Sequence, residues 1–429
     1  MRKWLWVISI VLILMVPTAA WAEVPLPEDS ATEISTLSRG EFAALLVTAA
    51  DLEGEGEPAD ILLEQGIMKG VPGKQADLDR PITRVEAAVL LGRSLGLTDG
   101  ILAPATVDIT LPQDHWAYST YSWLTRLGLV SGDPLTVLTK EEGAALVDNV
   151  FKTTEEAIDL LEKIQAQSEP ENISSLRVTM DGTMRLIPRS EAEGADEIPA
   201  LTSSLQMIQE MVLPATIHQS TTVKLQLPDI GDQEIVTESY IVDGKMYQQL
   251  PDPETGELRW SRYPDGMVPD LEDIMEKAKQ STQIIPPGLE KSLFYKVLGT
   301  TELNGEQVYE IAFYGKIDDI MEFLSATLGS LGDSPLIGEA LSGASSIIDS
   351  VSFWGLSYVG VDDYLTRESD YGALVTYAKE FQDESIPLEA IEMVMRAKDY
   401  TYNDIENIAI PDEVLTAPEI TLPQETKQQ

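Results

Sequence analysis

Three short segments near the N-terminus repeat one helix start, and this repetition constrains the fold more than any other feature. The segments are LSRGEFAALLV (37–47), ITRVEAAVLL (82–91) and LTKEEGAALV (138–147). Each has Ser or Thr, then a basic residue, and Glu three positions after the Ser or Thr, which predicts a capping box. The basic residues Arg39, Arg84 and Lys140 are separated by 45 and 56 positions (84−39 and 140−84). Units of that size cannot bury an apolar face alone, so we expect them to pack together.

Other short motifs accompany these helix starts. GIMKG (66–70) and GLVSG (128–132) are glycine-bounded turns, and Asp108 precedes His115-Trp116-Ala117. Taken in order, the motifs of residues 37–151 resemble the S-layer homology (SLH) domain. Its repeats carry Thr-Arg-Ala-Glu, an aspartate before His-Trp-Ala, and a Gly-hydrophobic-hydrophobic-x-Gly turn. The chain departs from this pattern: the first repeat lacks its first helix, the second lacks His-Trp-Ala, and the third has lysine for arginine.

The resemblance implies an all-α module of three degenerate repeats that binds acidic polysaccharide linked to peptidoglycan. It makes candidate polymer-binding residues of Arg39, Arg84, Lys140, Asp108 and Trp116. A guanidinium fork suits a sugar carboxylate better than an ammonium group does. The alternative is structural: Arg84 then merely pairs with a nearby acid such as Asp79 or Glu86.

The first residues predict export. Arg2 and Lys3 precede an apolar run that ends near Ala20-Trp21-Ala22, which is typical of a cleaved signal peptide of residues 1–22. Residues 23–36 form an acidic leader, and no other apolar run reaches membrane-spanning length. The chain has no cysteine, so a lipidated N-terminal cysteine and disulfides are excluded. We therefore expect a secreted protein at the cell wall or cell surface, with no transmembrane segment after signal cleavage.

Residues 153–417 have a different pattern of apolar and polar residues. After an amphipathic helix at 153–167, segments such as 173–187, 218–227, 234–250, 293–315 and 353–375 alternate with period two, as antiparallel strands do. Asp243-Gly244 and Asn304-Gly305 predict tight hairpin turns. Helical segments at 271–279 and 317–351 are expected to cover the sheet. The fold class is α+β, an all-α module followed by an antiparallel β domain.

The order of these elements resembles the LolA/LppX-like exported lipoproteins. The resemblance rests on YIVDGKMY (240–247), Trp260, LNGE (303–306) before Val308-Tyr309, and YNDI (402–405) before Ile410-Pro411. It implies a half-open antiparallel barrel, with helices over its concave face, that shelters a lipid or another hydrophobic ligand. A polar tail, residues 418–429, ends the chain.

Charge and missing motifs restrict the function further. A formal net charge of −43 argues against nucleic acid as a partner, since binding phosphates requires lysine and arginine. The two histidines, His115 and His218, stand apart, and no nucleophile elbow, P-loop or zincin motif occurs. We therefore expect no catalytic residue, metal or cofactor. A monomer is expected because three-repeat SLH modules can complete themselves within one chain. Two alternatives stay open: a purely structural surface-layer component, and a wall-modifying hydrolase that uses opposed carboxylates.

Overall fold

The computed structural model describes residues 35–69, 77–104, 107–169, 171–189, 201–213, 216–227, 231–252, 255–265, 289–319, 347–378 and 388–420. The expected signal peptide, most of the acidic leader, the helical segment at 271–279 and most of that at 317–351 lie outside these residues. The parts outside stay predictions, but Ile317 and Ile348–Val351, at the described ends of the second segment, lie in strands, so the helical prediction is wrong there.

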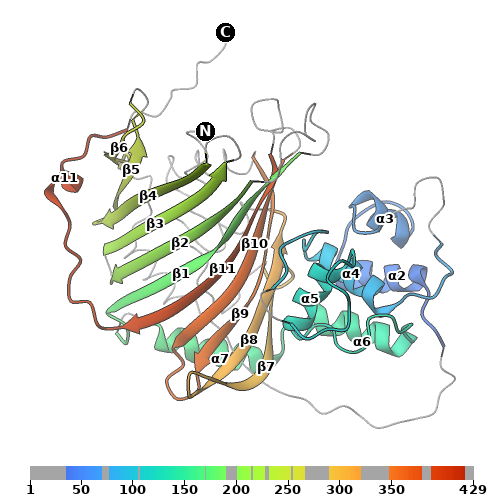
Figure 1. Ribbon diagram of the computed structural model, residues 1–429. Helices are drawn as coiled ribbons and strands as arrows, with labels where there is room; N and C mark the ends of the chain where they lie inside the picture. Colours follow the sequence, from blue (N-terminus) through green and yellow to red (C-terminus); the bar gives the residue numbers. More distant parts are fainter. Residues whose placement is uncertain are drawn as a thin grey trace. The chain divides into compact units, whose positions relative to one another are not determined.

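In the described part of the chain, six helices come first, eleven strands follow, and the short helix α11 comes last (Figure 1). The helices are α2 (Arg39–Ala49), α3 (Pro58–Glu64), α4 (Arg84–Ser94), α5 (Tyr118–Arg126), α6 (Lys140–Val150), α7 (Glu155–Gln167) and α11 (Asp412–Leu415). The strands are β1 (Ser175–Pro188), β2 (Leu201–Val212), β3 (Thr216–Leu227), β4 (Gly231–Val242), β5 (Lys245–Pro251), β6 (Leu258–Arg262), β7 (Leu293–Leu303), β8 (Glu306–Ile317), β9 (Ile348–Gly360), β10 (Thr366–Tyr377) and β11 (Leu388–Tyr402).

The strands form one 11-stranded sheet in the order β6-β5-β4-β3-β2-β1-β11-β10-β9-β8-β7. The pairings of β1 with β2 and β11, and those within β2–β6 and β7–β9, are antiparallel. Both predicted hairpin turns are present, with positive φ at Asp243 (48°), Gly244 (71°), Asn304 (53°) and Gly305 (88°). This backbone matches the right-handed twist of the flanking strands. The expected α+β class with a large open antiparallel sheet is confirmed.

Strand β2 is absent from the sequence prediction, which places no strand between Ile187 and His218. In this segment Leu205, Ile208 and Met211 recur every three residues, a spacing typical of a helix. Pairing with β1 on one side and β3 on the other holds the segment extended instead. Tertiary pairing therefore overrides the local pattern.

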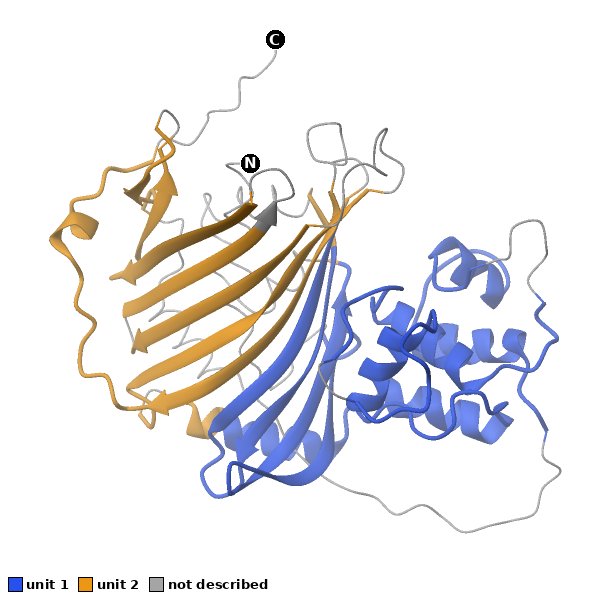
Figure 2. Cartoon of the chain, viewed as in Figure 1, with its two compact units in different colours: residues 1–164, 284–318, 350–376 blue, residues 165–283, 319–349, 377–429 orange. Residues whose placement is uncertain are grey.

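The chain divides into two compact units (Figure 2). Unit 1 contains residues 1–164, 284–318 and 350–376, and unit 2 contains residues 165–283, 319–349 and 377–429. The helices α2–α6 thus belong to the same unit as most of β7–β10. The boundary expected from the sequence at residues 151–153 stays a prediction.

Within unit 1, aromatic side chains join the helices to the strands. Trp123 of α5 packs edge-on against Trp354 of β9, with ring centroids 6.0 Å apart. Phe151, which follows α6, meets Phe294 of β7 at 5.7 Å in the same edge-on manner. Both tryptophans are almost completely buried. Residues 118–151 therefore share a hydrophobic core with the strands of unit 1.

A partly buried cation reinforces this junction. Arg126, at the end of α5, donates to the hydroxyl of Tyr358 (2.9 Å) and to the carboxylate of Asp370 (2.7 Å). Tyr358 in turn donates to Glu310 (3.2 Å), and burial raises the pKa of the Tyr358 hydroxyl. Removal of one member would leave a buried charge or dipole without its partner.

Helix α7 packs against the opposite face of β8 and β9. Leu160, Leu161 and Ile164 contact Ile311 and Val359. Tyr314 of β8 and Trp354 of β9 point to the other face of these strands. There Tyr314 donates to the carbonyl of Val150 in α6, and Trp354 packs on Trp123 in α5. The central parts of these strands are therefore covered on both faces.

In unit 2, residues 403–420, the C-terminal strap, cross one face of the sheet. Ile408 and Val414 of the strap pack on Tyr240 of β4 and Tyr247 of β5. Near the end of the strap, Arg262 of β6 donates its N–H to Pro418 (2.9 Å), and Ile420 donates to Arg262 (2.9 Å). Residues 418–420 of the expected polar tail are therefore hydrogen-bonded to the sheet.

We predict that Trp354→Ala lowers the free energy of unfolding by about 3–5 kcal/mol, because it leaves a large cavity between α5 and β9. Trp116→Ala is the matched control, since that indole is 56% exposed and its loss should cost little. Denaturant unfolding followed by circular dichroism measures both. Equal losses in the two variants would contradict the packing described.

Candidate functional site

The three repeated helix starts meet in a closed ring of backbone hydrogen bonds. Ile82 donates to Leu37 (2.9 Å), Leu37 donates to Leu138 (2.8 Å), and Leu138 donates to Ile82 (3.0 Å). These three residues, the cap ring, each stand directly before a helix-capping residue, and all are buried. The repeats therefore close on one another in the cyclic order 1, 2, 3, 1.

Each repeat presents the predicted capping box. Ser38, Thr83 and Thr139 precede α2, α4 and α6, and each exchanges hydrogen bonds with the glutamate three residues later. The basic residues Arg39, Arg84 and Lys140 occupy the first position of these helices. The backbone N–H of each donates to the next repeat, at Arg80, Thr136 and Ser35 respectively. The structure thus brings the three predicted cations into equivalent positions.

Two of these cations are neutralised by the capping glutamate of the next repeat. Arg84 donates to Glu142 (3.0 Å), and Lys140 donates to Glu41 (2.5 Å). Hydrogen bonding from Lys140 is the largest cause that lowers the pKa of Glu41. Gly132 makes room for Arg84, because an added Cβ would lie 2.6 Å from the guanidinium. The alternative expected from the sequence, a structural ion pair of Arg84 with Asp79 or Glu86, is wrong in its partners, because Arg84 pairs with Glu142.

The third cation lacks this ion pair. By the same cyclic order Arg39 would reach Glu86, but Arg80 already holds Glu86 through two hydrogen bonds, 3.1 and 2.6 Å long. The Nε–H of Arg39 is buried and donates to no acceptor, and the side chain forms no hydrogen bond or ion pair with any described residue. Of the three equivalent positions, this one keeps an available guanidinium.

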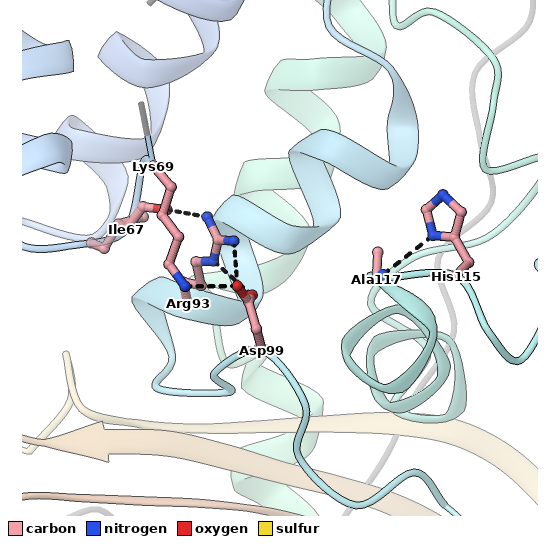
Figure 3. A network of polar contacts seen from close by, with 6 residues as sticks. All are labelled: Ile67, Lys69, Arg93, Asp99, His115 and Ala117. Atoms are coloured by element: carbon pink, nitrogen blue, oxygen red, sulfur yellow. Dashed lines mark hydrogen bonds and ion pairs between the residues drawn. The ribbon is translucent and has the colours of Figure 1, made fainter. Parts of the chain in front are cut away.

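The remaining predicted polymer-binding residues lie outside the cap ring. Asp108 is exposed and lines a hollow of about 520 Å³ together with Val107, Thr125 and Arg126. Trp116 is exposed beside His115, whose Nδ1 accepts a hydrogen bond from the N–H of Ala117 (3.2 Å), as Figure 3 shows. His115 thus shapes the start of α5. No contact among the described residues joins Asp108 or Trp116 to the three cations.

Sequence reasoning missed a second polar network in the same helices (Figure 3). Arg93 of α4 binds both carboxylate oxygens of Asp99 (3.0 and 2.8 Å) and the carbonyl of Ile67 (2.9 Å). Lys69 also donates to Asp99 (2.7 Å). Burial works to raise the pKa of Asp99, but these cations outweigh it and the pKa is lowered. The network ties the GIMKG turn to α4, which is a structural role.

In unit 2, one face of the sheet gathers the methionines. In antiparallel pairs, directly opposed residues share a face, so the strand registers define its members. The methionine face of strands β1–β5 and β11 carries Met180, Met184, Met207, Met211, Met246, Met393 and Met395. Met68 is the only other methionine among the described residues. Met207 is fully buried, whereas Ile235, on the same face near the far end of β4, is 43% exposed. The face therefore extends from a buried region to solvent.

On β1–β3 and β11 the opposite face is charged, whereas on β4 and β5 it carries Tyr240 and Tyr247, which pack on the strap. Asp181 of β1 pairs with Lys398 of β11 (2.7 Å), and Arg185 pairs with the buried Glu392. Glu210 of β2 lies between Arg177 (3.4 Å) and His218 (3.1 Å). The two faces of this sheet thus differ sharply in chemistry.

Other kinds of site have little support in the described part of the chain. No group of three or more histidine or carboxylate side chains there is placed to hold a metal ion. Of the helices described, none has both the length and the apolar character needed to cross a membrane.

Comparison with known proteins gives limited information. No protein-family model matches the chain, and no curated protein matches it in sequence. Among solved structures, Mycobacterium tuberculosis lipoprotein LppX aligns at 11% identity and a TM-score of 0.24, covering 58% of this chain and 97% of LppX. LprF from Mycobacterium bovis aligns at 9% identity and a TM-score of 0.26, covering 59% of this chain and 96% of LprF.

A DUF1329 family protein from Desulfovibrio piger aligns at 9% identity and a TM-score of 0.19, covering 57% of this chain and 91% of that protein. At these TM-scores the alignments carry no argument about what this chain binds.

The Arg80–Glu86 pair makes stability depend on pH. Burial works to raise the pKa of Glu86, but hydrogen bonds from Arg80 and Thr83 hold the pKa below its ordinary value of 4.5. The folded state therefore binds this proton less tightly than the unfolded state does. Its contribution to stability is complete above pH 4.5 and is lost as pH falls through the lower folded-state pKa.

We predict that Glu86→Gln is less stable than the wild type at pH 7. Its thermal midpoint should also fall less steeply than that of the wild type as the pH is lowered below 4.5. Calorimetry between pH 7 and pH 3 measures this. Glu141→Gln, at an exposed first-turn position of α6, is the control and should keep the wild-type pH profile. An unchanged profile in Glu86→Gln would rule out the assigned role of the pair.

Proposed function

We propose that this protein is a non-catalytic binding protein whose methionine face holds a hydrophobic ligand. The observation that carries the proposal is the gathering of seven methionines on one face of the unit 2 sheet. Methionine side chains are flexible and polarisable, so they adapt to apolar ligands of irregular shape. The sequence resemblance to LolA/LppX-like exported lipoproteins supports the same ligand class.

Binding of N-phenyl-1-naphthylamine, a neutral dye that fluoresces in apolar surroundings, tests this proposal. The protein should bind it saturably. Met184→Gln and Met211→Gln, at half-buried positions of the face, should each weaken binding by about tenfold, because each removes apolar contact from the ligand.

Thr202→Gln is the control, since Thr202 is exposed on the opposite face of β2. Equal dye binding by all three variants would mean that the dye lies elsewhere. An absence of dye binding in the wild type would favour the alternative of a purely structural surface-layer component. Opposed carboxylates with hydrolytic activity toward wall glycans would favour the hydrolase instead.

The proposal has a second part, in which α2–α6 act as an SLH-like anchor to the cell wall. The protein would be exported, monomeric and held at the cell surface by acidic polysaccharide linked to peptidoglycan. Arg39 favours this role, because its guanidinium lacks the ion pair that occupies both equivalent cations. A free guanidinium fork can bind a sugar carboxylate through two parallel hydrogen bonds. Asp108 and Trp116 stay candidates for contacts with the same polymer.

We predict that Arg39→Gln loses at least about tenfold in affinity for purified cell-wall sacculi, since a charge-assisted contact is removed. Lys140→Gln is the matched control: it removes the same charge from the equivalent helix position but from a cation already paired with Glu41. Co-sedimentation of the chain from residue 23 onward, with sacculi that keep or lack their acidic polymer, measures this. Equal losses in both variants would show that the paired cations bind as well.

A further inference from the structure

A row of amide and hydroxyl side chains crosses the methionine face. Gln209 of β2 lies opposite Gln219 of β3, which lies opposite Ser239 of β4. Ser239 in turn lies opposite Gln248 of β5, and Gln248 opposite Ser261 of β6. These five residues, the amide row, lie side by side on one face because antiparallel partners share a face.

From β1 to β5, the rows on both sides of the amide row are uncharged and mostly apolar. One contains Met211, Ile217, Ile241 and Met246, and the other contains Met180, Met207, Thr221 and Thr237. Successive residues on one face of a strand are roughly 6.8 Å apart, so the polar groups form a narrow band between apolar surfaces. Such a band is costly unless its groups have hydrogen-bond partners.

The side chains of the amide row differ in whether they form hydrogen bonds. Gln248 accepts a hydrogen bond from the hydroxyl of the buried Tyr263 (2.7 Å), and Gln219 donates to Thr221 (3.1 Å). Gln209 is only 7% exposed, yet its amide forms no hydrogen bond with any described residue. The amide atoms of Gln209 are not among the fully buried polar atoms that lack a partner, so they reach the surface of this face and are open to a group bound on it.

The chemistry of the row restricts that partner. A glutamine amide is neutral and can both donate and accept a hydrogen bond. From β1 to β5, no lysine, arginine or carboxylate occurs in the amide row or in the two rows beside it; charge appears only at the β6 end, where Arg259 lies opposite Leu250 and pairs with Asp252 (3.0 Å). A charged group, such as a phosphate or a carboxylate, would lie there without a counter-charge, which is unfavourable at a buried position. A neutral carbonyl fits better.

We propose that the amide row binds the ester or amide linkage of an amphiphile, whose apolar arms lie over the methionine rows on either side. Gln209 donates a hydrogen bond from its amide to the carbonyl oxygen of the linkage. The row thereby fixes the position of the ligand along the face, while the methionines tolerate different arms. This inference rests on the proposed hydrophobic ligand, and it adds the chemical class of that ligand.

The test compares two probes of nearly equal size. Decyl decanoate has a central ester between two alkyl arms, and heneicosane is a hydrocarbon of the same chain length without it. Both are delivered from methyl-β-cyclodextrin to the full chain and compete with bound N-phenyl-1-naphthylamine. Gln209→Met keeps the shape of the side chain and removes the amide. Gln206→Met, on the opposite face of the same strand, is the matched control.

We expect the wild type and Gln206→Met to bind the ester about tenfold more tightly than the hydrocarbon, as one buried hydrogen bond allows. Gln209→Met should lose that preference and bind heneicosane as the wild type does. Its thermal midpoint without ligand should not fall, because the substitution breaks no hydrogen bond of the Gln209 side chain. Gln219→Met provides a second test within the row if that midpoint does fall.

Two other outcomes would overturn the inference in distinguishable ways. Equal binding of both probes by the wild type, or an ester preference that survives in Gln209→Met and Gln219→Met, would remove the amide row as the site of recognition and leave hydrophobic binding intact. Displacement of the dye by neither probe, together with no saturable dye binding, would overturn the proposed function itself.

Discussion

The register of the antiparallel sheet is the constraint on which the chemistry of this protein depends. In unit 2, pairing of Met180 with Met207 and of Gly182 with Leu205 places the methionines on one face and the ion pairs on the other. A slip of one residue would exchange the two faces and bury Asp181 and Arg185 among methionines. Gly182 fixes the approach of β1 and β11, because an added Cβ would meet the backbone carbonyl of Val394.

Local chemistry made part of the fold predictable from sequence. The capping boxes, the Asp-Gly and Asn-Gly turns and most strands depend on residues within a few positions of each other, and the structure confirms them. Strand β2 depends instead on its neighbours, and its three-residue apolar spacing favours a helix. Because Gln209 lies in that strand, the amide row could not be foreseen either: a row exists only once the register is known.

The cations of the helical repeats show the same limit. Their helix positions follow from the repeated motif, but their charge environment depends on partners far along the chain, with Arg84 reaching Glu142 and Lys140 reaching Glu41. The difference at Arg39 arises from one local residue, Arg80, which has taken the third glutamate. Arg80 and Glu86 are both visible in the sequence. Only the cyclic order of the repeats, however, shows that their pairing leaves Arg39 without a carboxylate partner. The polymer-binding roles themselves stay predictions.

The C-terminal strap has a consequence for the solubility of the protein. Strand β6 is the last strand of the sheet at one end, and a free edge of this kind can recruit a strand from another molecule. Here Arg262 already exchanges backbone hydrogen bonds with Pro418 and Ile420, and β6 is only 5 residues long. The strap thus acts as an intramolecular guard against pairing of this edge with a strand of another molecule.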